Sequence, residues 1–293
     1  MRSGFVSIIG RPNVGKSTLL NNILGKKVAI TSDKPQTTRN NIQGIYNDDD
    51  YQIIFVDTPG IHKPKTKMGK YLNKQAFFSV HDVDVILFLV DVTKSLGTGD
   101  KFVINSLKDI EKPVILILNK IDKIAKSKIL PKIEQYMTLY DFDEIVPISA
   151  LNHDNLDHLL KVLKKHMKDS VKYYEDDQIT NVSKEFMITE FVREKIFNLT
   201  NDEVPHSITC VIENKEEKKD AIVLHVNIIV DRDNLKKIII GRNGNMIKQI
   251  GVEARKDIEN FLGKKVYLDL FVKTIKKWRD KENYLAEIGL KTE

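Results

Sequence analysis

The sequence has almost no cysteine and no long apolar segment. Cys210 is the only cysteine among 293 residues, which excludes an internal disulfide, fits a reducing compartment and predicts a small buried hydrophobic side chain. The longest apolar run, 83–90, is interrupted by Asp84. It is far shorter than the ~18 residues of a membrane span, so it predicts a buried strand. Met1-Arg2-Ser3-Gly4 leads directly into the first strand pattern, so we expect no cleavable signal peptide.

The sequence also has little excess charge of either sign. With 47 lysines and arginines against 41 aspartates and glutamates, the net charge is +6. An excess this small favours a polyanionic partner only weakly, so the positions of the cations matter more than their sum. The hydrophobic share of 41% is ordinary for a globular protein, and the length allows one or two domains.

The first half of the chain alternates strand and helix patterns, which predicts an α/β domain with a mixed, mostly parallel sheet. The polar turn 47–50 lies between two strand patterns and predicts one antiparallel hairpin within that sheet. The expected strands are Phe5–Ile9, Ile42–Tyr46, Gln52–Val56, Val83–Val90, Val114–Leu118 and Ile145–Ile148. The expected helices are Lys16–Leu24, Met68–Val80, Lys101–Ile110, Ile129–Tyr140 and Asn155–Met167.

The order of elements changes after an acidic stretch, 172–178, that lacks helical periodicity. We therefore predict a first domain over 1–172, a linker over 173–182 and a second, α+β domain over 183–293 with a basic C-terminal tail. The charged run 214–219 is expected to be a solvated hairpin turn. The expected elements here are helix Ser183–Asn198, strands Ser207–Glu213 and Ala221–Val230, helices Leu235–Ile240 and Asn245–Leu262, and strand Val266–Phe271.

A glycine-rich loop follows the first strand and opens the first helix. It fits the pattern G-x-x-x-x-G-K-[ST] of phosphate-binding loops, and the strand–loop–helix context supports the match. The glycines allow successive N–H groups to turn towards phosphate oxygens, and the helix adds the positive end of its dipole. Lys16 is placed to reach the β- and γ-phosphates, and Ser17 to offer its hydroxyl to Mg²⁺. The predicted nucleotide-binding residues in this loop and helix are Gly10, Arg11, Pro12, Asn13, Val14, Gly15, Lys16, Ser17 and Thr18.

The base is indicated by Asn119-Lys120-Ile121-Asp122, which ends an apolar strand. The motif therefore lies at the carboxyl edge of the sheet, where α/β proteins bind ligands. A carboxylate at Asp122 accepts hydrogen bonds from the two N–H donors of guanine, whereas adenine presents the reverse pattern. Alone the motif is weak, but with the preceding loop it predicts a guanine-nucleotide site that includes Asn119, Lys120 and Asp122.

Three further polar segments are expected at the same carboxyl edge of the predicted sheet. Asp57 can hold Mg²⁺ through water, and Gly60 can lend its N–H to the γ-phosphate. A threonine between the phosphate-binding loop and Asp57 can offer its hydroxyl to Mg²⁺ only when the γ-phosphate is present. The segments are Pro35-Gln36-Thr37-Thr38-Arg39, Asp57-Thr58-Pro59-Gly60, and Ser149-Ala150-Leu151, whose N–H groups are placed to meet the guanine oxygen.

A second glycine pair lies between the short and the long helix of the second domain. A KH domain clamps about four nucleotides of single-stranded RNA against such a G-x-x-G loop. The loop alone is a weak signal, but the order helix, strand, strand, helix, loop, helix, strand is that of a type II KH domain. The predicted RNA-binding residues are Gly241, Arg242, Asn243, Gly244 and Lys248.

Cations outnumber anions from residue 235 to residue 281, and a local excess of this kind attracts phosphate backbones. Trp278 lies within the basic tail and has two readings: a base-stacking side chain, or an anchor of the tail to the core. The cations are Lys236, Lys237, Arg242, Lys248, Arg255, Lys256, Lys264, Lys265, Lys273, Lys276, Lys277, Arg279 and Lys281, against Glu253, Asp257, Glu259, Asp269 and Asp280.

In chain order, the segments GRPNVGKS, TTR, DTPG, NKID and SAL resemble the G1 to G5 motifs of translation-factor-class small GTPases. With the KH pattern, nearly the whole chain resembles the Era family, the ribosome-assembly branch of the TrmE-Era-EngA-like GTPases. The resemblance implies a Ras-like domain that binds GTP or GDP, with Mg²⁺ held by Ser17, Thr38 and Asp57. It assigns the switch I threonine to Thr38, with Thr37 as the alternative.

The residue after Gly60 is Ile61, where Ras-like enzymes carry a glutamine that orients the attacking water. Isoleucine can neither accept nor donate a proton, and the Era family likewise carries a hydrophobic residue there. His62 is one alternative, although a side chain shifted by one position points elsewhere and loop histidines are commonly solvated.

Hydrolysis is therefore expected to depend on positioning and charge, with Lys16, Thr38 and Gly60 as the catalytic residues. In related GTPases with the hydrophobic substitution, an asparagine at the position of Asn13 helps to bind K⁺. The resemblance thus implies K⁺ as a second cation; the other reading of Asn13 is a hydrogen bond to the switch loop.

For the RNA, the resemblance implies the 3′ region of 16S ribosomal RNA and the 30S subunit as partners, with no obligate protein partner. Two rival functions remain: an RNA chaperone that uses GTP only as a structural ligand, and a membrane-associated regulatory GTPase whose basic tail binds anionic lipid. The predicted role in ribosome assembly places the protein in the cytoplasm, and the membrane-associated alternative adds peripheral contact with the inner face of the cell membrane.

Overall fold

The computed structural model describes residues 1–34, 37–61 and 67–281. The chain forms two compact units. The first comprises Met1–Thr31 and Pro35–Asn181, and the second comprises Ser32–Lys34 and Val182–Glu293. Among the helices of these described residues, none combines the length and the apolar character needed to cross a bilayer.

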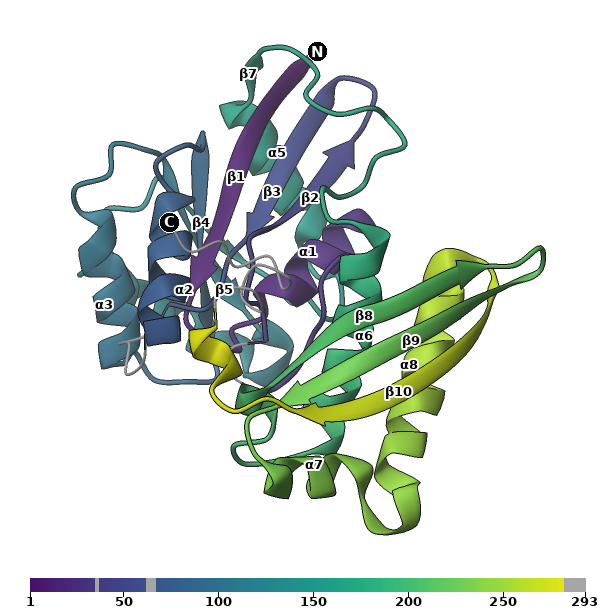
Figure 1. Ribbon diagram of the computed structural model, residues 1–293. Helices are drawn as coiled ribbons and strands as arrows, with labels where there is room; N and C mark the ends of the chain where they lie inside the picture. The colour runs from purple at the N-terminus through teal and green to yellow at the C-terminus, as the bar shows by residue number, and fades with distance from the viewer. Residues whose placement is uncertain (35–36, 62–66, 282–293) are drawn as a thin grey trace. The chain divides into compact units, whose positions relative to one another are not determined.

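The first unit contains a seven-stranded sheet whose main path runs β2-β3-β1-β4-β5-β6, with β7 paired to β1 (Figure 1). All pairs from β3 to β6 are parallel, whereas β2 pairs with β3, and β7 with β1, in antiparallel fashion. The predicted mixed, mostly parallel sheet with one hairpin is confirmed. The strands are β1 Arg2–Gly10, β2 Ile42–Asn47, β3 Tyr51–Asp57, β4 Val85–Asp91, β5 Val114–Asn119, β6 Glu144–Pro147 and β7 Lys168–Asp169.

Helices cover both faces of this sheet, as the alternating sequence requires. One face carries α2, α3 and α4, whose apolar side chains join those of β4 and β5 in one buried cluster. The other face carries α1 and α5 (Figure 1). The helices are α1 Lys16–Leu24, α2 Lys67–Phe78, α3 Thr98–Leu107, α4 Ile129–Met137 and α5 Leu156–His166, with short 3₁₀ turns Ile121–Lys123 and Lys126–Lys128.

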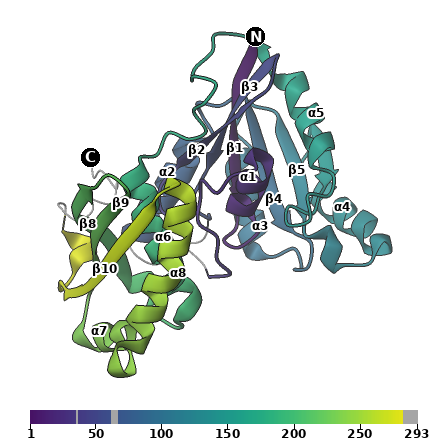
Figure 2. The ribbon, with the colours of Figure 1, turned by 90° about the vertical axis from the view of Figure 1, so that its right-hand side faces the viewer.

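The second unit is a three-stranded sheet, in the order β10-β9-β8, with α6 and α8 on one face (Figure 2). Strands β8 and β9 are antiparallel, whereas β9 and β10 are parallel. This connectivity confirms the predicted type II KH topology. The elements are α6 Lys184–Leu199, β8 Ile208–Glu217, β9 Ala221–Val230, α7 Asp233–Ile240, α8 Asn245–Leu262 and β10 Lys265–Thr274, with 3₁₀ turns Pro205–Ser207, Arg242–Gly244 and Trp278–Asp280.

An aromatic contact and an ion pair join α6 to α8. The rings of Phe191 and Phe261 meet edge to face, with centroids 5.5 Å apart, and Lys195 Nζ lies 2.6 Å from Asp257 Oδ2.

Trp278 is fully buried, and its Nε1 donates to the carbonyl oxygen of Ser207 at 3.0 Å. Of its two readings, the anchor is the correct one, because a buried indole has no face to offer a base. Cys210 is buried, as predicted.

Two segments differ from the sequence-based expectation. Strand β8 continues to Glu217 through a register shift between Ile212 and Asn214, so the charged run 214–219 is mostly strand rather than turn. The prediction failed because β-bulges carry no composition signal. The segment 173–181, acidic and non-helical in sequence, is bonded to the first unit: Ile45 N donates to Ile179 O at 2.9 Å, and Thr180 Oγ1 to Gln43 O at 2.7 Å.

Candidate nucleotide site and nucleic-acid groove

The loop between β1 and α1 is closed so tightly that its glycines cannot be replaced. Gly15 has φ +104°, and a Cβ there would lie 2.3 Å from Asn119 Nδ2; a Cβ at Gly10 would lie 2.3 Å from the carbonyl oxygen of Leu89. Lys16 is the first residue of α1 and is only 6% exposed. Its Nζ donates to Arg11 O at 3.2 Å, so the cation lies within the loop where a phosphate would bind.

Three oxygen-bearing side chains from different segments meet beside Lys16. Ser17 Oγ donates to Asp57 Oδ2 at 2.6 Å and lies 3.0 Å from Thr38 Oγ1, which itself lies 3.3 Å from Asp57 Oδ2. The other carboxylate oxygen, Asp57 Oδ1, is buried and has no hydrogen-bond partner among the residues that the structure describes. Hydroxyl and carboxylate oxygens are the donors that Mg²⁺ prefers, so this cluster fits that ion. Of the two candidate threonines, the structure brings Thr38 to the cluster.

Burial perturbs both charged groups at this point. It lowers the pKa of Lys16, which the nearby carboxylate of Asp57 raises in part. It raises the pKa of Asp57, which Lys16 and the hydroxyls of Ser17 and Thr38 lower in part. Each group is therefore short of opposite charge, and an anionic phosphate together with a divalent cation would supply it.

The segment after Asp57 lies against the phosphate-binding loop. A Cβ at Gly60 would lie 2.8 Å from the Cα of Pro12, and Ile61 N donates to Gly10 O at 3.0 Å. Thr58 is buried and donates to Ile8 O at 2.8 Å. The side chain of Ile61 is fully buried in the core cluster below the sheet edge, so it cannot contact a water at the phosphate. His62 lies outside the described residues.

Asn119 links three loops of the predicted site to one another. Its Nδ2 donates to Val14 O at 2.8 Å, and its Oδ1 accepts hydrogen bonds from Lys120 N at 2.8 Å and Ala150 N at 2.9 Å. Lys120 Nζ then donates to Asn13 O at 2.8 Å and to Asp91 Oδ2 at 2.6 Å. These bonds fix the phosphate-binding loop relative to the loop that carries Asp122.

Asp122 is exposed at the rim of the site, where a planar base has access. Its Oδ1 accepts a hydrogen bond from Ser149 Oγ at 2.6 Å, which orients the carboxylate. Two of the three N–H groups assigned to the guanine oxygen already have acceptors: Ser149 N donates to Asp154 O at 3.2 Å, and Ala150 N to Asn119. A base that used Ala150 N would share it with Asn119, whereas Leu151, 64% exposed, follows at the surface.

Two acidic residues that were not predicted from the sequence, Asp100 and Asp91, have side chains that hold residues of the site in place. Arg11 Nη1 donates to Asp100 Oδ2 at 2.9 Å, and the same oxygen accepts from Gly97 N at 2.9 Å at the start of α3. The side chain of Arg11 thus braces the loop against α3 rather than entering it. Asp91 has a similar bracing role through Lys120. Neither acid stands in a recognised motif, so the only signals were the position of Asp91 at the end of β4 and that of Asp100 in the first turn of α3.

In the second unit, the two glycines of the G-x-x-G loop differ in their surroundings. Gly241 has φ +73°, and a Cβ there would lie 2.6 Å from Met246 Cβ. Gly244 has φ +75°, but none of the described residues lies within 4 Å of a Cβ added to it. Gly241 is therefore required by packing, whereas Gly244 presents open backbone at the start of α8. Arg242, Asn243 and Lys248 are exposed around it.

A groove of about 300 Å³ begins beside this loop and runs between α8 and β10. Its floor is apolar and its edges carry cations, which suits unstacked bases and their phosphates. The lining residues are Ile247, Lys248, Gly251, Val252, Arg255, Leu268, Asp269 and Leu270.

Comparison with known proteins agrees with both units. Residues 5–120 match the family model of 50S ribosome-binding GTPases, and residues 203–279 match that of KH domains. Era from Aquifex aeolicus, solved as a point variant bound to GDP·AlF₄⁻, is 42% identical with a TM-score of 0.95, and the match covers 100% of both chains.

A second solved structure, Era in complex with MgGDPNP and nucleotides 1506–1542 of 16S ribosomal RNA, is also 42% identical. It has a TM-score of 0.96 and likewise covers 100% of each chain. Identity at this level over the full length, with the five nucleotide motifs and the G-x-x-G loop in place, shows that the chain belongs to the Era family of GTPases.

Proposed function

We propose that this chain binds and hydrolyses GTP with Mg²⁺ and uses its nucleotide state to control binding of the 3′ region of 16S ribosomal RNA. Its place of action is the cytoplasm, during assembly of the 30S subunit. The observation that carries the nucleotide part is the cluster of Ser17, Thr38 and Asp57 with its unpartnered carboxylate oxygen. The groove beside the G-x-x-G loop carries the RNA part.

Each residue of the nucleotide site has a definable task. Backbone N–H groups of the loop 10–17 and Lys16 hold the phosphates, and the N–H of Gly60 is assigned to the γ-phosphate. Ser17, Thr38 and Asp57 hold the metal, which when bound polarises the phosphate oxygens. Asn119 and Lys120 keep the loops in register.

The water-orienting group is not Ile61, whose side chain is buried. We keep K⁺ as a proposed second cation near Asn13. Asn13 has φ +65°, and its carbonyl oxygen accepts a hydrogen bond from Lys120 Nζ. The backbone of Asn13 therefore lies where the phosphate-binding loop contacts the loop that carries Lys120.

Asp122→Asn is expected to shift preference from GTP to xanthosine triphosphate. In xanthine an oxygen replaces the exocyclic amine of guanine, so the amide of asparagine would donate where the carboxylate accepts. A change of about 100-fold in the ratio of the two affinities is expected, because the mismatched pair leaves polar groups unsatisfied. Competition titrations of both nucleotides measure it, and an unaltered ratio in the variant would refute the assignment of Asp122.

RNA affinity is expected to be higher with a non-hydrolysable GTP analogue than with GDP, and Thr38→Ala is expected to remove the difference. A ligand shifts a conformational equilibrium only if it binds the two states unequally. Thr38 is the proposed switch residue, and its hydroxyl contacts that of Ser17 in the proposed Mg²⁺ site. The measurement is titration of RNA containing nucleotides 1506–1542 at one fixed salt concentration.

The control for this experiment is GDP binding, which the Thr38 variant should retain, because the threonine is needed only in the γ-phosphate state. Equal RNA affinities in both nucleotide states of the wild-type chain would contradict the switch and leave two independent activities on one chain.

Peripheral membrane contact through the basic tail is the second candidate function, and the structure gives it less support. Lys273 Nζ lies 2.6 Å from Glu213 Oε1, and Arg279 is paired with Asp231. One cation of β10 and one of the segment that follows it are thus already paired with neighbouring carboxylates, which weakens attraction to anionic lipid. Vesicle flotation and RNA titration of the same chain, in the same buffer, would compare lipid binding with RNA binding.

A further inference from the structure

Strand β10 carries apolar side chains on both of its faces. Leu268 and Leu270 point to the groove that the strand shares with α8. The alternate residues Tyr267 and Phe271 lie on the opposite face and are 63% and 49% exposed. Large aromatic side chains this exposed on a sheet face indicate a binding surface rather than core.

A third ring belongs to the same face. His225 of β9 stacks on Phe271, with ring centroids 6.4 Å apart and an angle of 26° between the planes. Its Nδ1 lies 3.4 Å from Asp269 Oδ2, which holds the imidazole in place. In the strand register, Tyr267 pairs with Val223 and Asp269 with His225, so the three rings follow one another along two neighbouring strands. We call Tyr267, His225 and Phe271 the aromatic face.

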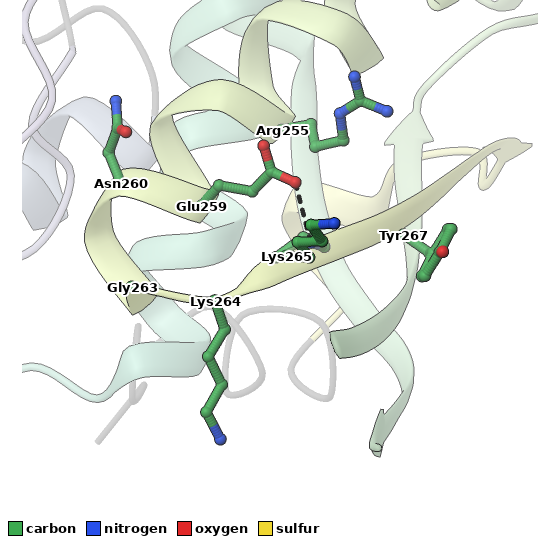
Figure 3. A pocket seen from close by; sticks show the side chains of 8 residues that line it. Arg255, Glu259, Asn260, Gly263, Lys264, Lys265 and Tyr267 are labelled. Atoms are coloured by element: carbon green, nitrogen blue, oxygen red, sulfur yellow. Dashed lines mark hydrogen bonds between the residues drawn. The ribbon is translucent and has the colours of Figure 1, made fainter. Parts of the chain in front are cut away.

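A cationic passage connects the groove to this face. A cavity of about 480 Å³ lies where α8 ends and β10 begins, and it shares Arg255 with the groove. Figure 3 shows Arg255 on α8, Lys264 and Lys265 at the turn, and Tyr267 extending away from β10. Within the described residues, none of these three cations has a carboxylate within ion-pair distance. Glu259, the acid of the cavity, instead accepts the N–H of Val266 at 3.0 Å.

We propose that the aromatic face binds unpaired bases of the RNA strand after it leaves the groove, with Arg255, Lys264 and Lys265 holding the phosphates in between. The proposal rests on the proposed RNA binding of the groove. A KH groove accommodates about four nucleotides, so a longer single strand must continue elsewhere, and the passage is the cationic continuation of that groove. Flat sheets with exposed rings bind bases by stacking, without needing a particular sequence.

The first test is an RNA titration of the full chain with point variants of the aromatic face. Tyr267→Ala and Phe271→Ala are each expected to weaken binding of RNA containing nucleotides 1506–1542 by about tenfold, since one stacked base is lost. Tyr267→Phe should keep wild-type affinity, whereas Tyr267→Leu should not, because stacking needs a π face. Leu130→Ala, which removes an apolar side chain that is 62% exposed on α4, is the control and should change nothing.

The second test varies the RNA. With a four-nucleotide single strand, which the groove alone can hold, Tyr267→Ala should bind as well as the wild-type chain. With 4-thiouridine in the longer RNA, ultraviolet cross-links should map to Tyr267 or Phe271 by mass spectrometry. Normal affinity of both alanine variants for the long RNA, with no cross-link on β10, would overturn the proposal.

The outcomes also separate this proposal from the proposed function. If Gly244→Asp fails to weaken RNA binding, the groove itself is wrongly assigned. If Gly244→Asp weakens binding while the aromatic variants bind normally, only the aromatic face is wrongly assigned. Concentration-dependent dimers in sedimentation that Tyr267→Ala abolishes would assign the face to a second copy of the chain and likewise overturn the proposal.

Discussion

Lys16→Ala is expected to lower the rate of GTP hydrolysis by at least about 100-fold, the cost of removing one preorganised donor from a buried transition-state site. The lysine is nearly buried inside the phosphate-binding loop, and the nearby carboxylate of Asp57 offsets only part of the burial that lowers its pKa. Its charge therefore acts in a low-dielectric site, where it stabilises phosphate oxygens far more than a surface lysine would. Phosphate release under single-turnover conditions measures the effect.

A matched control is Lys161→Ala, which removes an exposed lysine of α5 and should leave the rate unchanged. Thermal unfolding of both variants separates catalysis from stability. The experiment also decides against one rival function, since an RNA chaperone that holds GTP as a structural ligand would show no hydrolysis for the substitution to remove. A Lys16 variant that hydrolyses GTP at the wild-type rate would contradict the site.

Gly244→Asp is expected to weaken RNA binding by at least about tenfold while leaving basal GTP hydrolysis intact. The substitution places a carboxylate where the groove meets the phosphate backbone, replacing attraction with repulsion and costing at least one charge-assisted hydrogen bond. Because nothing lies within 4 Å of the added Cβ, the fold has room for it. An acid at the N-terminus of α8 also suits the helix dipole.

Gly25→Asp is the control for backbone strain. Gly25 also has a positive φ, +62°, and also has nothing within 4 Å of an added Cβ, but it ends α1 in the other unit. It should bind RNA normally. Gly241→Asp is a poorer probe, since its Cβ would meet Met246 at 2.6 Å and any loss would mix misfolding with repulsion. Wild-type RNA affinity of the Gly244 variant would remove the loop from the binding site.

Sequence was sufficient for the architecture because its signals are local. Strand and helix periods, the hairpin turn 47–50 and the two glycine loops each specify a short segment, and the alternation of strands and helices predicts a mostly parallel sheet. The motif residues fall at strand ends, so their convergence at one edge was predictable. Thr38 was assigned by resemblance alone, and its contact with Ser17 is consistent with that assignment.

Long-range side-chain partners were not predictable in the same way. Asn119 joins three loops and Arg11 reaches Asp100, contacts that depend on the final packing of distant segments. The different surroundings of Gly241 and Gly244 depend on the position of Met246, which the pattern G-x-x-G does not encode. The aromatic face was missed because alternation along β10 shows which residues share a face but not that this face stays uncovered.

The chain that leads out of the first unit has a protective consequence. Strand β2 is the last of its sheet, and an uncovered last strand is a template for pairing with another molecule. Residues of the segment 173–181 occupy that edge: Thr180 bridges to Gly44, and the side-chain amide of Gln52 holds the backbone of Tyr173 and Tyr174 at 2.7–3.0 Å. The segment 173–181 therefore covers the edge of β2 as well as connecting the two units. Pulling it free would expose a strand edge that could pair with another molecule.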